Sequence, residues 1–163
     1  MNQPIQLVSS AKNMHMVLKE MACWVFFALV WFGPLGFRDL IHPDEGRYAM
    51  LSLGMLQSGD WVTPRLNGVL YFEKPPLQYW AGALSFMLFG VNDFAARLWP
   101  ALTGFGAVIM VAFTANRLWR SQVGRLAAIV MGSTTWVIGN SHFLTLDMGL
   151  TFFLTVAPVS YTH

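Results

Sequence analysis

The sequence predicts an all-α, polytopic membrane protein, and three observations support this fold class. Of the 163 residues, 55% are hydrophobic and only 11% are charged, whereas soluble domains average roughly 25% charged residues. Two apolar runs, 21–37 and 97–115, are long enough to be membrane helices. The charged residues concentrate between these runs, in residues 38–76. The bilayer is therefore the expected solvent, and no basic run indicates nucleic-acid binding.

The first membrane helix is predicted at residues 21–37, after a polar N-terminus (residues 1–20). Lys12 and Lys19 precede the helix, so the positive-inside rule places residues 1–20 in the cytoplasm. No Ala-x-Ala cleavage site follows the apolar run, which is therefore predicted to be an uncleaved helix rather than a signal peptide. Residues 38–96 then form a long external loop.

The external loop contains a predicted amphipathic helix at residues 45–57 that lies on the membrane surface. One helical stripe of this segment carries three apolar or aromatic side chains: Tyr48, Leu51 and Met55. Ser58-Gly59-Asp60 ends the helix, and Asn67-Gly68 predicts a tight turn.

The next apolar segment, residues 77–90, is short and is predicted to remain at the outer interface. Three arginines follow the run 97–115: Arg117, Arg120 and Arg125. The charge rule places them in the cytoplasm, so 97–115 crosses inward and 126–143 returns outward. In the alternative topology 77–90 crosses, which leaves the three arginines outside.

The last apolar segment, residues 148–157, begins another helix that is too short to cross a bilayer. Residues 158–163 break the pattern, and we expect a truncated or non-native tail there. The expected organisation is thus a cytoplasmic N-terminus (1–20), a membrane domain (21–157) and this tail.

Two adjacent acids, Asp44 and Glu45, are the first candidate site residues. In one interpretation Asp44 is a helix N-cap and Glu45 a first-turn acid that complements the helix dipole. In the other, a carboxylate at the membrane surface accepts a proton from an acceptor hydroxyl, or holds a cation or amino group.

The segment Tyr71-Phe72-Glu73-Lys74-Pro75-Pro76 is the second candidate. Lys74 is suited to bind a lipid phosphate at headgroup level, and Glu73 to bind a metal ion or orient Lys74. The alternative is a surface ion pair of little energetic consequence. Asp147, the third candidate, is an acid in an apolar stretch, which indicates function unless it caps a helix.

Several motifs occur in a fixed order: Asp44-Glu45-Gly46-Arg47-Tyr48, Gly59-Asp60-Trp61, Glu73-Lys74-Pro75-Pro76-Leu77, Asn92-Asp93-Phe94-Ala95-Ala96-Arg97-Leu98 and Leu146-Asp147. Together they resemble the start of bacterial members of the dolichyl-phosphate-mannose–protein mannosyltransferase superfamily. The lipid A aminoarabinose transferases are the most similar branch, and the resemblance covers about residues 20–157.

This resemblance implies a GT-C-type transmembrane module, incomplete here, whose long first external loop carries amphipathic juxtamembrane helices. It implies sugar transfer from a polyprenyl-phosphate (undecaprenyl-phosphate) donor to lipid A, another glycolipid or a protein. The reaction is an inverting single displacement at the outer face of the bacterial inner membrane. The roles implied are catalysis for Asp44 and Glu45, substrate binding for Arg47, Tyr71, Lys74 and Asp147, and a divalent metal at Glu73.

Two other classes remain open on the sequence alone. A transporter or flippase would use Asp44, Glu45 and Asp147 as ion sites, and a membrane scaffold would use none of them. Transporter acids tend to lie mid-span, whereas these acids lie at span ends. The sequence leaves the sugar, the acceptor, metal dependence and oligomeric state undetermined, and we expect the chain by itself to be inactive.

Overall fold

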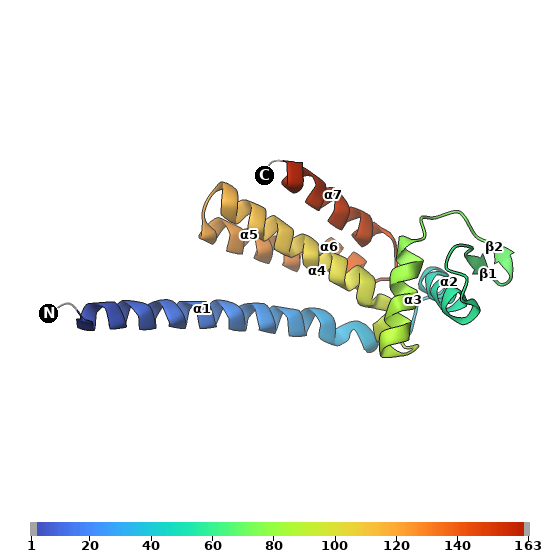
Figure 1. Cartoon of the computed structure of the whole chain (residues 1–163), viewed down its shortest axis with the longest axis horizontal. Coiled ribbons are helices and arrows are strands. Elements are labelled where there is room, and N and C mark those ends of the chain that lie inside the picture. Colours follow the sequence, from blue (N-terminus) through green and yellow to red (C-terminus); the bar gives the residue numbers. More distant parts are fainter. Residues whose placement is uncertain (1–2, 162–163) are drawn as a thin grey trace. The chain divides into compact units, whose positions relative to one another are not determined.

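A computed structural model describes residues 3–161 (Figure 1). The chain divides into two units, Met1–Gly33 and Pro34–His163. The first unit is one continuous helix, α1 (Gln3–Phe32). It passes through the predicted boundary at residue 20 without a break.

A short 3-10 helix, η1 (Gly33–Gly36), follows α1 at the boundary between the units, and the predicted external loop then contains α2 (Asp44–Ser58). α2 confirms the predicted amphipathic helix, because Tyr48, Leu51 and Met55 are all buried. Gly59 ends α2 with a φ of 70° and donates its N–H to the Met55 carbonyl, as a left-handed glycine cap does.

The predicted turn at Asn67-Gly68 joins two short antiparallel strands, β1 (Arg65–Leu66) and β2 (Val69–Leu70). Asn67 and Gly68 have φ values of 52° and 83°. Positive φ at both central residues is the property that makes Asn-Gly favourable in a two-residue hairpin.

α3 (Leu77–Phe89) packs against α2 and lies across the end of α4 (Asp93–Leu118) (Figure 1). The 13 residues of α3 reach about 20 Å, too short for a hydrocarbon core of about 30 Å. Gly82 permits the close approach of α3 to α2, since a Cβ there would collide with Ser52. The crosswise direction of α3 agrees with the predicted interfacial segment.

Small residues let the remaining helices pack closely on α4. Gly104 faces Ser141, Gly106 faces Phe152, and Gly124 faces the backbone of α4, as is common in membrane helix packing. The partners are α5 (Ser121–Ser133), α6 (Thr135–Ser141) and α7 (Asp147–Tyr161).

Two expected helix boundaries were wrong. The predicted helix 126–143 is divided into α5 and α6 at Thr134, whose backbone is extended. Thr134 donates its hydroxyl to the Val130 carbonyl at 2.7 Å, but Thr103 and Thr114 make the same bond inside α4, so this bond does not by itself explain the break. The predicted helix 148–157 extends to Tyr161, so the expected tail begins within α7. Residues 162–163 of that tail lie outside the described residues.

Among residues 3–161, two segments have the length and composition of membrane spans, Met14–Gly36 and Asp93–Leu118. α3 and α7 are shorter apolar helices. The described chain is thus mostly helical, as predicted, with the short β1–β2 hairpin as the exception.

Candidate functional site

Glu45 lies at the centre of the second unit and is fully buried. Arg97 contacts both carboxylate oxygens, with Nε–Oε1 at 2.8 Å and Nη2–Oε2 at 3.0 Å. Arg38 contacts the same two oxygens at 2.6 and 3.2 Å. The backbone amides of Ile41 and Leu144 each donate at 2.9 Å. Each carboxylate oxygen thus accepts three hydrogen bonds, and none is left for a substrate.

Arg97 is also buried, with 1% of its surface exposed, and all its N–H groups are used. Besides the two bonds to Glu45, its Nη1 donates to the carbonyls of Leu35 and Arg38 at 2.9 and 2.8 Å. Its Nη2 donates to the carbonyl of Asp39 at 2.9 Å. Arginine has five such donors in a planar fork, so Arg97 ties α4 to α2 and to the segment before it. We call Glu45, Arg97 and Arg38 the anchor.

The anchor holds Glu45 ionised. Burial alone would raise the pKa of the Glu45 carboxyl. The hydrogen bonds from Arg97, Arg38 and the amides of Ile41 and Leu144 outweigh that effect and lower its pKa to about 2. The predicted catalytic role of Glu45 stays a prediction, but its geometry is that of a structural anion.

Asp44, the neighbour of Glu45, is exposed and makes no ion pair with the anchor within the described residues. The helix-cap interpretation of Asp44 was wrong, because α2 begins at Asp44, its cap residue is Pro43, and no side chain caps it. Arg47 Nη2 lies 3.6 Å from Asp44 Oδ1. Asp44 is therefore an accessible carboxylate in the first helical turn, next to an immobile residue.

Arg47 and Tyr71 are brought together by the structure, as expected for a shared binding site. The neighbouring Tyr71 phenol raises the pKa of Arg47, although no hydrogen-bond partner is found for the Tyr71 hydroxyl within the described chain. The charge of Asp44 acts on Arg47 as well. Three predicted site residues thus lie within electrostatic reach of one another.

Glu73 and Lys74 form an exposed ion pair, with Nζ–Oε1 at 3.7 Å. Both side chains are more than one third exposed, so the pair contributes little to stability, and Lys74 is accessible to an anionic ligand. The charge of Glu73 also acts on Tyr48 of α2, so this turn faces the start of that helix.

Asp147 is exposed in the first turn of α7. Its place relative to α2 follows from Leu144, whose amide binds Glu45 and whose side chain is part of the apolar core around Tyr79. The anchor therefore joins the chain just before Asp147 to the helix that carries Asp44.

Within the described residues, no group of three or more His, Cys, Asp or Glu side chains is arranged to hold a metal ion. The metal site at Glu73 remains a prediction that would require ligands from elsewhere, and we derive no chemistry from it.

Sequence reasoning missed the anchoring role of Arg38 and Arg97, and it missed two buried polar residues at the start of α3, Gln78 and Tyr79. One signal for Arg97 was available, since an arginine at the start of an apolar run needs a partner to be buried. Nothing local indicated that the partner would be Glu45, 52 residues earlier.

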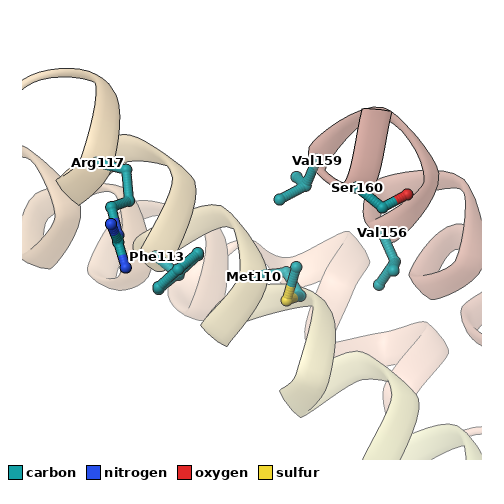
Figure 2. Close-up of a pocket in the computed structure, with 6 residues that line it drawn as sticks. All are labelled: Met110, Phe113, Arg117, Val156, Val159 and Ser160. Carbon is teal, nitrogen blue, oxygen red and sulfur yellow. The ribbon is translucent and has the colours of Figure 1, made fainter. Parts of the chain in front are cut away.

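A cavity of about 310 Å³ lies elsewhere in this unit, between α4 and α7 (Figure 2). Its lining is Met110, Phe113, Arg117, Val156, Val159 and Ser160. None of the predicted site residues lines it, so the cavity and the acidic site are distinct.

An exposed acid, an arginine and a lysine lie on the segment between the apolar helices, and the fold around them is similar to that of a GT-C-type glycosyltransferase. The sequence profile of the dolichyl-phosphate-mannose-protein mannosyltransferase family matches residues 16–163. The chain belongs to this family, which confirms the resemblance noted from its motifs.

Similar proteins agree with this assignment. The chain is 39% identical over 136 residues to an undecaprenyl phosphate-alpha-4-amino-4-deoxy-L-arabinose arabinosyl transferase of Enterobacter sp. (strain 638), covering 83% of the chain and 25% of that protein. A protein of the same name from Serratia proteamaculans is 42% identical over 139 residues, covering 84% and 25%. The chain thus spans about a quarter of the length of these relatives.

The fold is similar to that of ArnT from Cupriavidus metallidurans in the apo state, with a TM-score of 0.79 and 36% identity. That match covers 89% of this chain and 26% of ArnT. The crystal structure of the same ArnT bound to undecaprenyl phosphate matches with a TM-score of 0.78, over 82% of this chain and 26% of that one.

Proposed function

We propose that this chain carries part of the catalytic site of a glycosyltransferase that moves a sugar from a polyprenyl-phosphate donor to an acceptor. The relatives named above are undecaprenyl-phosphate-aminoarabinose transferases, and a similar structure binds undecaprenyl phosphate. The proposed acceptor is lipid A, another glycolipid or a protein. The reaction takes place at the outer face of the inner membrane.

The observation that carries this proposal is the contrast between two adjacent carboxylates. Glu45 is buried and fully bonded, while Asp44 is exposed beside it. A catalytic group must be held within about 0.5 Å of its productive position by supporting contacts. Glu45 therefore acts as the positioning residue and Asp44 as the catalytic one, which refines the expectation that both act in catalysis.

Lys74 and Arg47 hold the donor phosphate. Lys74 Nζ is accessible on the turn before α3, and Arg47 is one turn after Asp44 in α2. Their positive charges stabilise the phosphate as its bond to the sugar breaks. Tyr71, next to Arg47, contacts the substrate, and Asp147 supplies a second acid to the site.

The reaction is a single displacement. The acceptor oxygen forms a bond to the anomeric carbon as the bond from that carbon to the phosphate oxygen breaks. The polyprenyl phosphate leaves with the bonding electrons, and the configuration at the carbon inverts. When the acceptor is a hydroxyl, its proton passes to Asp44; when it is an ionised phosphate, Asp44 only positions it.

The transporter alternative gains no support from the described residues. Glu45 is neutralised by two arginines and cannot bind a transported cation. Asp44 and Asp147 are the first residues of α2 and α7, whereas the acids of a transporter tend to lie in the middle of a membrane span.

A transfer assay tests the proposal. The gene that encodes this chain is expressed at full length, and membranes are supplied with undecaprenyl-phosphate-linked aminoarabinose and lipid A. We expect Asp44→Ala to lower the rate by about 10² to 10⁴ and Lys74→Ala to raise the KM for the donor. Asp39→Asn, an exposed acid of the same loop, is the control. Wild-type rates in both variants would contradict the assigned roles.

The outward orientation has its own test. In a Cys23→Ser background, a cysteine introduced at Asp147 should react with an impermeant maleimide added to intact spheroplasts. One introduced at Arg120 should react only after the cells are lysed. Labelling of the Arg120 position from outside would reverse the topology.

A further inference from the structure

The start of α3 contains three buried side-chain atoms that find no hydrogen-bond partner within residues 3–161. They are the hydroxyl of Tyr79 and both the amide nitrogen and oxygen of Gln78. Gln78 is 4% exposed and Tyr79 is fully buried. Leaving such a group unpaired costs roughly 1–3 kcal/mol, so native proteins retain one only for a reason. We call Gln78 and Tyr79 the unpaired pair.

The position of the unpaired pair relates it to the donor. Both residues lie in the first turn of α3, which begins three residues after Lys74. Tyr71 lies close to Tyr79. Burial, followed by the nearby Tyr71, raises the pKa of the Tyr79 phenol. Arg47 also acts on Tyr79. The unpaired pair is therefore next to the side chains that would hold the donor phosphate.

The chemistry of the unpaired pair suits a sugar ring. A phenol can donate one hydrogen bond and accept another, and a glutamine amide offers two donors and an acceptor. Neighbouring hydroxyl and amino groups on a sugar need this mixture. Neither residue carries a charge, so a free phosphate would gain little from them.

Tyr71 lies in the irregular segment that precedes α3. Its side chain is half-buried, and residues 71–76 have no helical or strand structure. Tyr79 itself is fixed, because its ring stacks on Tyr48 with centroids 6.3 Å apart.

We propose that Gln78 and Tyr79 form the recognition site for the sugar of the donor. This proposal rests on the proposed glycosyl transfer and extends it by assigning sugar specificity to these two residues. Their unpaired state costs stability in the free protein, and the sugar removes that cost by completing their hydrogen bonds.

The stability cost of the unpaired atoms distinguishes a binding role from a structural role in an experiment. Tyr79→Phe removes an unpaired hydroxyl and keeps the ring, so the free protein should be as stable as wild type or more stable. The same change should weaken binding of the sugar. If the hydroxyl instead bonds an ordered water or another part of the full-length protein, its removal should lower the melting temperature.

The experiment compares two ligands that differ only in the sugar, using full-length protein in detergent. For Tyr79→Phe and Gln78→Met, we expect the Kd for the sugar-linked undecaprenyl phosphate to rise about three- to tenfold, as for the loss of one neutral hydrogen bond. The Kd for undecaprenyl phosphate itself should not change. Tyr48→Phe is the matched control, since it removes the hydroxyl of the stacked partner ring.

The outcomes separate the two proposals. A selective loss of affinity for the sugar-linked lipid at unchanged or raised melting temperature supports sugar recognition by the unpaired pair. Three results would overturn sugar recognition even if the wild type transfers the sugar normally. They are equal affinities in all variants, a lowered melting temperature in Tyr79→Phe, and a higher KM for the acceptor alone. Absence of transfer in the wild type would instead contradict the proposed function.

Discussion

The anchor and the unpaired pair are both buried polar groups of the second unit, yet they are opposites in their bonding. In the anchor, Glu45 accepts hydrogen bonds from two arginines and two amides. In the unpaired pair, Gln78 and Tyr79 make no side-chain hydrogen bond within the described chain. Complete bonding indicates a structural role, because no capacity remains for a ligand. Missing bonds indicate groups kept for a ligand.

Asp44 and Lys74 complete this comparison as the exposed groups of the site. Asp44 is attached directly to the anchor through the peptide chain, and Lys74 lies between the hairpin and α3. The two charged groups thus stand on different supports, Asp44 in a helix next to the anchor and Lys74 on an irregular segment.

The largest effect is expected from removing one partner of the anchor. Arg97→Met leaves Glu45 buried with less compensation and should lower the free energy of unfolding by about 3–5 kcal/mol. Denaturant titration in detergent measures this. Arg117→Met, at the exposed end of the same helix, should change it by at most about 0.5 kcal/mol. Equal effects of the two variants would show that the anchor is not structural.

Lowering the pH should reduce the stability that the anchor provides, by less than the substitution of Arg97. The folded-state pKa of Glu45, about 2, is below its ordinary value of 4.5. Its stabilisation is therefore fully present above pH 4.5 and is lost as the pH falls towards 2, by up to about 3 kcal/mol. Melting temperatures recorded across this range should fall less steeply for Glu45→Gln than for the wild type. Identical slopes would mean that Glu45 does not titrate abnormally.

The smallest effect is expected at the exposed pair of Glu73 and Lys74. Glu73→Gln removes an ion pair of which both members are solvated, so the free energy of unfolding should change by less than about 0.5 kcal/mol. The same denaturant titration checks this. A loss as large as that of Arg97→Met would remove the distinction between the buried anchor and the surface site.

Local patterns predicted much of the fold. The apolar stripe of residues 45–57 indicated α2, Asn67-Gly68 indicated the hairpin turn, and the run 97–115 indicated the core of α4. Helix ends were less predictable. The break at Thr134, where the backbone is extended, is marked by no Gly or Pro at residues 133–135.

The sequence indicated the exposed candidate residues but not the bonding of the buried ones. Asp44, Arg47, Tyr71 and Lys74 were recognisable because charged and aromatic residues stand out in an apolar chain. The separate roles of Asp44 and Glu45 were not, because they depend on Arg97 reaching Glu45 across 52 residues of sequence. Unpaired atoms such as those of Gln78 are likewise visible only when every neighbour is known.

The most direct test of the account compares Asp44→Asn with Glu45→Gln, measuring the rate of sugar transfer per folded full-length protein. The account predicts that Asp44→Asn keeps the wild-type melting temperature and loses about 10²-fold or more in rate. Glu45→Gln should lower the melting temperature, with a loss of rate that follows from the disturbed position of Asp44. A wild-type rate for Asp44→Asn would contradict the central claim that the exposed acid beside the anchor is the catalytic one.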